Sequence, residues 1–204
     1  MDYQDQFQHT KEDYLTNYFD FAEWFVLFHI FKDAIAIKPR SILEIGVGNG
    51  VLEGLLRNRA DKYVTLDIND NLRPDFVGDL RDNDSSLVNM YDLVVCTQVL
   101  EHIDFEDVPK CLRNMHSYLK KGGRLMITLP HQKLYFMWLI PTNKPHVITM
   151  PRMFLKRTMD IHHKWEIGRG VKKCEFDAML KDVGFKYCSY KELLYEDYWL
   201  LEKI

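Results

Sequence analysis

The feature that most constrains this chain is a glycine turn set between a strand and a helix. Ser41–Ile45 is a short apolar run that predicts a buried strand, and it leads directly into Gly46–Gly50. Glycine lets the backbone turn tightly and approach a ligand closely. We expect a helix from Val51 to Ala60, and the free N–H groups at its start favour a negatively charged group. A strand, glycine turn and helix in this order are typical of nucleotide-type binding loops.

The spacing of the glycines separates two kinds of loop. A dinucleotide fingerprint, G-x-G-x-x-G, requires glycine or alanine at position 51. This chain has Val51 there, and its third glycine is Gly50. The pattern is E-x-G-x-G-x-G, beginning at Glu44.

An acidic residue ends the next predicted strand. Tyr63–Leu66 is followed by Asp67, about twenty residues beyond the loop, where a carboxylate can accept hydrogen bonds from both ribose hydroxyls. A turn or cap aspartate is the alternative, because Asn69–Asn71 is polar throughout.

Further strands and helices alternate along the chain. We expect strands at Phe76–Gly78, Tyr91–Thr97 and Arg124–Leu129, a helix from Glu106 to Leu119, and a continuation of the fourth strand through Gln98–His102. Such alternation predicts a parallel sheet with helices on both faces, and ligands bind at the carboxyl ends of its strands. The polar or glycine segments expected at these ends are Glu44–Gly50, Asp67, Asp79, Cys96–Gln98 and Pro130–His131.

These segments together resemble the class I S-adenosylmethionine-dependent methyltransferases, and most closely a small-molecule branch like the ubiquinone- and menaquinone-pathway enzymes. The matching runs cover about residues 40–131: ILEIGVGNG, VTLDIND, FVGDL, YDLVVCTQVLEHI and LKKGGRLMITLP. The resemblance implies an α/β, three-layer, Rossmann-like fold. Its seven-stranded, mostly parallel sheet has an antiparallel last strand and helices on both faces.

The resemblance also implies an S-adenosylmethionine site, with S-adenosylhomocysteine as product. In this chain the methionyl part would be held by Glu44, Gly46, Gly48 and Gly50, with Asn49 lining the loop. Asp67 would bind the ribose, Ile68 would pack on the adenine, and Asp79 would accept from the adenine amino group beside the Leu80 backbone. Cys96 and Gln98 would line the sulfonium end, where family members often carry aspartate or serine and glutamate, respectively.

The segments around this core are expected to form the acceptor side of one domain, 1–204. Residues 1–38 predict a helical cover, with one helix over 10–37 that either packs on the core or forms a lid. Residues 39–131 are the predicted cofactor-binding core, and 132–172 a substrate cover with a helix at Met150–Met159 and a polar loop at Asp160–Gly168. Residues 173–204 predict a helix, Lys173–Val183, and two last strands.

Methyl transfer from a sulfonium is an in-line displacement, so positioning in a dry pocket carries most of the catalysis. An oxygen or nitrogen acceptor also needs a base, and histidine is the usual one near neutral pH. His131 is the first candidate because it follows a strand, and His162 and His163 come next; a structural role is the alternative for each. No metal is expected, since the histidine spacings match no established ligand pattern.

The charge and composition of the chain limit the classes of binding partner that we expect. The net charge of −3 gives no general attraction to nucleic acid, while residues 144–173 carry a local excess of six positive charges. That excess is either a solvated surface or a contact for an anionic group on a small, apolar or aromatic acceptor. Four cysteines without CxxC spacing, no signal-peptide pattern and no long apolar run indicate a cytoplasmic protein.

Two other functions remain open from the sequence. One is an RNA or protein methyltransferase, which the basic segment favours. The other is a cofactor-binding subunit that does not catalyse transfer and supports a partner protein.

Overall fold

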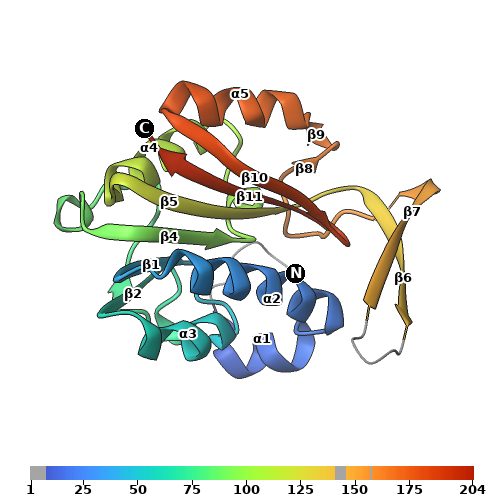
Figure 1. Cartoon of the computed structure of the whole chain (residues 1–204), viewed down its shortest axis with the longest axis horizontal. Coiled ribbons are helices and arrows are strands. Elements are labelled where there is room, and N and C mark those ends of the chain that lie inside the picture. Colours follow the sequence, from blue (N-terminus) through green and yellow to red (C-terminus); the bar gives the residue numbers. More distant parts are fainter. Residues whose placement is uncertain (1–7, 141–145, 157) are drawn as a thin grey trace.

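The protein is a three-layer α/β sandwich in the computed structural model, which describes residues 8–140, 146–156 and 158–204. A seven-stranded sheet forms the middle layer, with α2 and α3 on one face and α4 and α5 on the other (Figure 1). The helices are α1 (Lys11–Asn17), α2 (Phe21–Ile37), α3 (Val51–Leu56), α4 (Val108–Tyr118) and α5 (Lys173–Val183). The sheet strands are β1 (Ser41–Ile45), β2 (Lys62–Asp67), β3 (Phe76–Val77), β4 (Tyr91–Thr97), β5 (Leu119–Pro130), β10 (Phe185–Leu193) and β11 (Glu196–Lys203).

The order of the strands is β10-β11-β5-β4-β1-β2-β3. The pairs among β1 to β5 are parallel, whereas β11 is antiparallel to both β5 and β10. The predicted seven-stranded sheet with an antiparallel last strand is therefore confirmed. Because β11 runs in the opposite direction, its first residue, Glu196, pairs with Pro130, the last residue of β5. The start of β11 thus lies at the edge where the parallel strands end.

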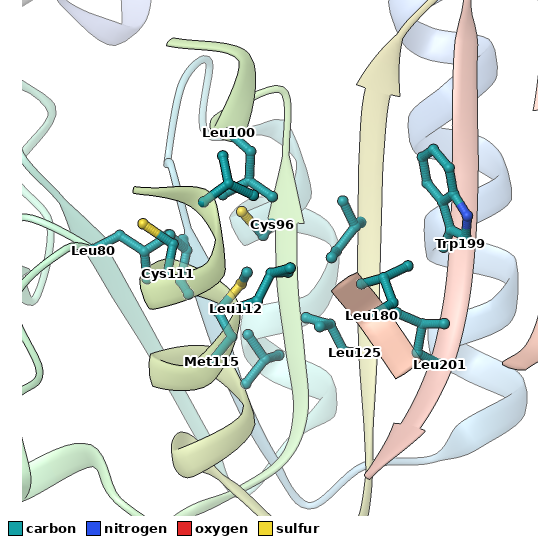
Figure 2. Packing of buried hydrophobic residues seen from close by; sticks show 14 of the residues in the cluster. Leu80, Cys96, Leu100, Cys111, Leu112, Met115, Leu125, Leu180, Trp199 and Leu201 are labelled. Carbon is teal, nitrogen blue, oxygen red and sulfur yellow. The ribbon is translucent and has the colours of Figure 1, made fainter. Parts of the chain in front are cut away.

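Each face of the sheet has its own core because side chains alternate along a strand. On β4, Leu93 and Val95 pack toward α2 and α3, while Val94 and Cys96 pack toward α4 and α5. Figure 2 shows part of the second cluster, in which Cys96 lies among leucines and Met115 of α4. Both faces of the central strands are apolar, as a parallel sheet covered on both sides requires.

Two predicted elements, β1 and α5, have the bounds that the sequence indicated, and β4 begins where it was predicted to begin. The helix expected over 10–37 is instead two helices. The carboxylate of Asp20 caps the second one by accepting from the N–H groups of Ala22 and Glu23. Thr10 and Asp13 form a capping box at the first. The chain therefore has a local reason to break between α1 and α2.

The helix predicted at Met150–Met159 is wrong. This region belongs to β7 (His146–Lys156), which pairs antiparallel with β6 (Lys133–Ile140) in a separate hairpin. The two β-branched residues before Met150, Ile148 and Thr149, pair with an apolar, aromatic partner run, and such pairs favour strands. The hairpin projects beyond the end of the sheet (Figure 1). Residues 141–145 and 157 of the predicted substrate cover lie outside the described residues.

The expected continuation of β4 is also wrong. Gln98 has a φ of 51°, so the chain turns there, and a 3₁₀ turn follows at Leu100–His102. Two further short strands, β8 (Glu166–Ile167) and β9 (Gly170–Val171), lie within and just after the predicted polar loop. Among the described residues, no helix has the length and apolar character needed to cross a membrane.

Candidate active site

A cavity of about 360 Å³ lies where the parallel strands end. This volume falls within the usual range for small-ligand pockets. Nine of the eleven residues predicted to bind a cofactor line it: Glu44, Gly46, Gly48, Asn49, Asp67, Ile68, Asp79, Leu80 and Gln98. The other two are outside the lining. Gly50 is the N-cap of α3, and Cys96 is a buried core residue beneath Gln98.

The glycine turn requires glycine at its first position. Gly46 has a φ of 81°, and a Cβ there would lie 2.3 Å from Cγ2 of Val99. Gly48 also has a positive φ, but apart from Gly48 and its two chain neighbours, no atom of the described residues lies within 4 Å of its ideal Cβ position. Since Gly48 lines the cavity, the turn brings bare backbone to the cavity wall.

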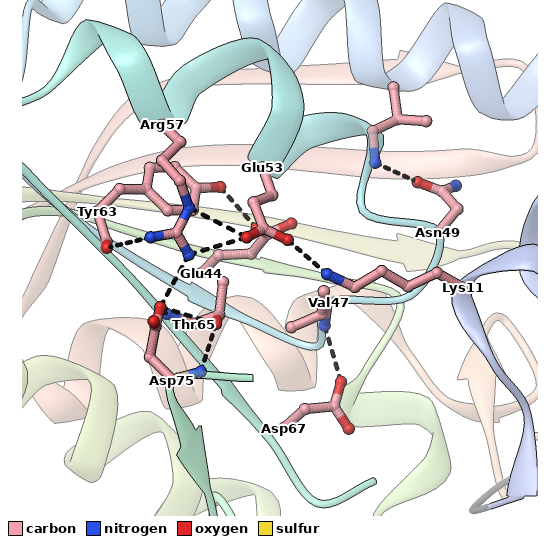
Figure 3. Close-up of polar contacts among 11 residues, drawn as sticks. Lys11, Glu44, Val47, Asn49, Glu53, Arg57, Tyr63, Thr65, Asp67 and Asp75 are labelled. Atoms are coloured by element: carbon pink, nitrogen blue, oxygen red, sulfur yellow. Dashed lines mark hydrogen bonds and ion pairs between the residues drawn. The ribbon is translucent and has the colours of Figure 1, made fainter. Parts of the chain in front are cut away.

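Asp67 joins the end of β2 to this turn (Figure 3). One carboxylate oxygen accepts from the Val47 N–H at 2.8 Å, and the other from the Asn69 N–H at 2.8 Å. Burial raises the pKa of Asp67, and the backbone N–H groups oppose that rise. Each oxygen keeps a lone pair for a ligand hydroxyl, because a carboxylate oxygen accepts about two hydrogen bonds.

Glu44 is buried at the base of the cavity and accepts a hydrogen bond from the Tyr63 hydroxyl at 2.6 Å. Burial raises the pKa of Glu44 to about 8, although the bond from Tyr63 lowers it. Without a bound cation, this carboxyl group therefore holds its proton at neutral pH.

Asp79 follows the end of β3, and its carboxylate is already hydrogen-bonded to a cationic side chain, that of Arg81. The guanidinium of Arg81 donates to both of its carboxylate oxygens, and this holds the pKa of Asp79 below its ordinary value. Both residues line the cavity. The sequence analysis did not identify Arg81, although it lies only two residues beyond Asp79.

Two glutamates, Glu23 and Glu196, contact the side chain of Gln98. The side-chain amide of Gln98 donates to Glu23 of α2 at 2.7 Å and to Glu196 of β11 at 2.5 Å. Burial raises the pKa of Glu23, which also lines the cavity. The sequence analysis missed both glutamates. Its own expectation of an antiparallel last strand could have placed the start of β11 at this edge.

The three predicted catalytic histidines separate into two groups. His131 is buried, its Nδ1 accepts from the Lys133 N–H at 3.0 Å, and it is not part of the cavity lining. His162 and His163 line the cavity, together with His102, which was not among the predicted catalytic residues. Burial lowers the pKa of His102 to about 4. Burial also acts against protonation of His163, but the bond to Glu166 together with the negative charges of Glu101, Asp160 and Glu166 outweighs this and raises the pKa of His163.

The chain before α2 covers one side of the cavity. His9, Tyr14 and Tyr18 contribute to the lining. Lys11 forms an ion pair of 2.7 Å with Glu53 of α3 and packs beside Gly50 (Figure 3). The helix α1 buries none of its residues, whereas α2 buries four against the sheet. The predicted core packing therefore applies to α2, whereas a lid role for α1 stays a prediction.

Comparison with known protein families identifies the family to which this fold belongs. Residues 17–189 match the profile of a methyltransferase domain. The chain belongs to this family. No curated protein sequence matches the methyltransferase.

Several solved structures are similar to this methyltransferase. The N-methyltransferase NodS of Bradyrhizobium japonicum, in complex with S-adenosylhomocysteine, has a TM-score of 0.66 at 11% identity, covering 98% of this chain and 96% of that one. Magnesium protoporphyrin IX methyltransferase of Synechocystis, with bound S-adenosylmethionine, has a TM-score of 0.63 at 16% identity, covering 100% and 98%. The 1,6-didemethyltoxoflavin N1-methyltransferase of Burkholderia thailandensis has 0.58 at 12%, covering 95% and 86%. At such identities the likeness concerns the fold.

Proposed function

We propose that this methyltransferase uses S-adenosylmethionine to methylate a small-molecule acceptor by in-line displacement. The observation that carries the proposal is the cavity itself. It combines the bare backbone of the glycine turn with Asp67 of the next strand. The structural neighbours with bound S-adenosylmethionine or S-adenosylhomocysteine support the same donor.

The charge of the cavity fits this cofactor. Five carboxyl side chains and one guanidinium, that of Arg81, are found among the described lining residues. S-adenosylmethionine carries a sulfonium and an ammonium against one carboxylate, so it is a net cation. A cavity of this sign favours such a ligand over an anionic nucleotide.

Each part of the cofactor has residues suited to it. Glu44 and the glycine turn would hold the methionyl end, and Asp67 would accept from the ribose hydroxyls. The adenine would lie against Ile68 and Leu80, with Asp79 and its partner Arg81 at its polar edge. Gln98 would lie at the sulfonium end, which supplies an already activated methyl group. Gly50 and Cys96 would support the wall from behind.

The acceptor would enter between Gln98 and the histidines. The lining near it is acidic, with Glu23 and Asp160, and the described lining holds no lysine. We therefore favour an acceptor with a hydroxyl or amine over one with an anionic group. In the transfer step the S–CH₃ bond breaks as a bond forms between the acceptor atom and the methyl carbon, and a base takes the proton of the acceptor. We propose His162, His163 and Glu23 as candidates for that base, because all three line the cavity.

A small acceptor fits better than a polymer. Residues of the N-terminal segment and of the loop around His162 both line the cavity, so its walls close over a limited volume. Small acceptors are also named for neighbours, among them 1,6-didemethyltoxoflavin. RNA or protein methylation and a non-catalytic supporting role remain the alternatives. The likeness to the ubiquinone and menaquinone branch stays a prediction.

Calorimetry with S-adenosylmethionine tests the donor. We expect micromolar-range binding, and we expect Asp67→Asn to weaken it at least about tenfold, since hydrogen bonds to a charged group are worth about 1.5–3 kcal/mol each. Asp61→Asn is the matched control, because Asp61 is exposed and forms its ion pair with Arg40, which is exposed as well. Absence of binding to the wild-type protein would refute the proposal.

A metabolite extract with labelled cofactor tests the acceptor. Label should enter a small-molecule fraction. Label confined to RNA or protein would favour the first alternative, and cofactor binding without any transfer would favour the second.

A further inference from the structure

We propose that Glu101, His102 and His163 form a site for one divalent metal ion at the wall of the cavity. One ligand atom from each residue lies within 4.8 Å of the others. Two imidazoles and one carboxylate are a common donor set for zinc and related first-row ions in catalytic sites. The sequence analysis expected no metal because the histidine spacings match no established ligand pattern; Glu101 and His102 are adjacent, but His163 follows about sixty positions later, which no short motif describes.

The hydrogen bonds of the two rings orient their lone pairs. Nδ1 of His102 lies 3.1 Å from the backbone oxygen of His162, so it must donate its proton there. Nδ1 of His163 lies 2.9 Å from a carboxylate oxygen of Glu166 and donates in the same way. In both rings the lone pair therefore resides on Nε2. Metal-binding histidines are typically held in this manner by a carbonyl or a carboxylate.

The two halves of the site are held together independently of any metal. The backbone N–H of Lys164 donates to the backbone carbonyl oxygen of Glu101 at 2.8 Å. The indole N–H of Trp165 donates to the backbone carbonyl oxygen of Ile103 at 2.9 Å. Lys164 also forms an ion pair with Asp104 at 2.8 Å. These contacts fix the loop carrying His163 against the turn carrying Glu101, so the donors are already close before an ion binds.

The site would be open toward the cavity. Glu101 is fully buried, whereas His102 and His163 line the cavity. Three protein ligands leave a fourth position for water or a substrate oxygen. If the proposed function holds, that position would take an acceptor hydroxyl. Coordination would release its proton to solvent, and the oxygen would then form its bond to the methyl carbon as the S–CH₃ bond breaks.

Titration of the metal-free full-length protein with Co²⁺ tests the site without relying on activity. We expect one equivalent to bind, with the visible absorption of a low-coordinate Co²⁺ complex, and Zn²⁺ to displace it. His163→Ala and Glu101→Gln should each weaken binding at least about tenfold, the range for losing metal-site groups. Thermal unfolding of Glu101→Gln checks that this buried variant is folded.

His162→Ala is the matched control, because its backbone oxygen, not its side chain, holds His102. It should keep Co²⁺ affinity within about twofold of wild type. Equal loss in His162→Ala and His163→Ala would overturn the proposal, as would no binding by the wild-type protein. Calorimetry with S-adenosylmethionine on the same metal-free samples keeps the two proposals apart: cofactor binding without Co²⁺ binding refutes only the metal site, and the reverse refutes only the donor.

Discussion

At the residue scale, the hydrogen bonds of the Gln98 amide explain why this chain has glutamine where similar methyltransferases often carry glutamate. A glutamate at this position would place a third carboxylate beside Glu23 and Glu196. The amide instead donates one proton to each of them. Two buried carboxyl groups can therefore come near each other, because a neutral donor lies between them. Burial raises the pKa of Glu23 toward the range in which a carboxyl can act as a base, and the hydrogen bond from Gln98 opposes part of that rise.

Glu44 provides a prediction at the same scale. Its pKa is about 8 in the folded protein, above the ordinary 4.5. The proton is thus bound more tightly when the chain is folded, so the associated stability is present below about pH 4.5 and is lost as pH rises through about 8. Urea unfolding without cofactor should show the free energy of unfolding of the wild type falling relative to Glu44→Gln between pH 5 and pH 9. The difference should approach about 1.4 kcal/mol per unit of pKa shift.

Glu12→Gln is the control for this experiment, since Glu12 is an exposed carboxyl on α1. Its profile should run parallel to that of the wild type. Parallel profiles for Glu44→Gln would contradict the buried, protonated state of Glu44.

At the scale of elements, α1 and α2 differ although the sequence reads them as one. Val26, Leu27, Ile30 and Ala34 anchor α2 in the core, while α1 contributes no buried residue. Its attachment is polar, through the Lys11–Glu53 ion pair and the bond from the Asn69 amide to the His9 oxygen. Segments with few buried contacts open at low free energy.

We therefore expect hydrogen exchange to be fast in α1 and slow in α2 when no cofactor is present. Addition of S-adenosylhomocysteine should slow exchange in residues 11–17, because Tyr14 and Tyr18 line the cavity. The amides of Ile30–Ala34 in α2 serve as the internal reference. Slow exchange of α1 in the ligand-free protein, or no change on binding, would argue against a ligand-ordered cover.

The bounds of α5 and β7 show where local sequence signals are enough to predict secondary structure and where they are not. The helix α5 begins and ends as predicted because Gly184, with a φ of 103°, closes it and an apolar face repeats along it. In contrast, β7 was predicted as a helix because its pairing with β6 determines its conformation. Local propensity is a weak guide where a partner strand decides.

At the scale of the molecule, the site joins parts of the chain that lie far apart. Residues from α1, α2, the ends of β1 to β4, the β10–β11 turn and the loop at 160–163 meet around one cavity. A ligand there contacts elements packed on both faces of the sheet, so its binding should stabilise the whole fold. With S-adenosylhomocysteine at about a hundredfold over Kd, we expect Tm to rise by about 5–10 °C.

Differential scanning calorimetry measures this shift. Asp67→Asn at the same ligand concentration should reduce it. A single transition that moves as a whole is expected, and a shift confined to part of a split transition would contradict the joint stabilisation.

The sequence by itself determined the donor side of the site. Glu44, the glycine turn and Asp67 are close in the chain, so local turn geometry and the rule that parallel strands end at one edge predict that they meet, while their proposed cofactor roles come from the family resemblance. Tertiary structure alone decided the acceptor side. Glu23, Glu196, Glu101 and His163 come together only because β11 is inserted antiparallel beside β5 and because the loop carrying His163 is bonded to the turn after β4. Contacts of such long sequence separation leave no periodic or spaced pattern in the chain, so folding was needed to reveal them.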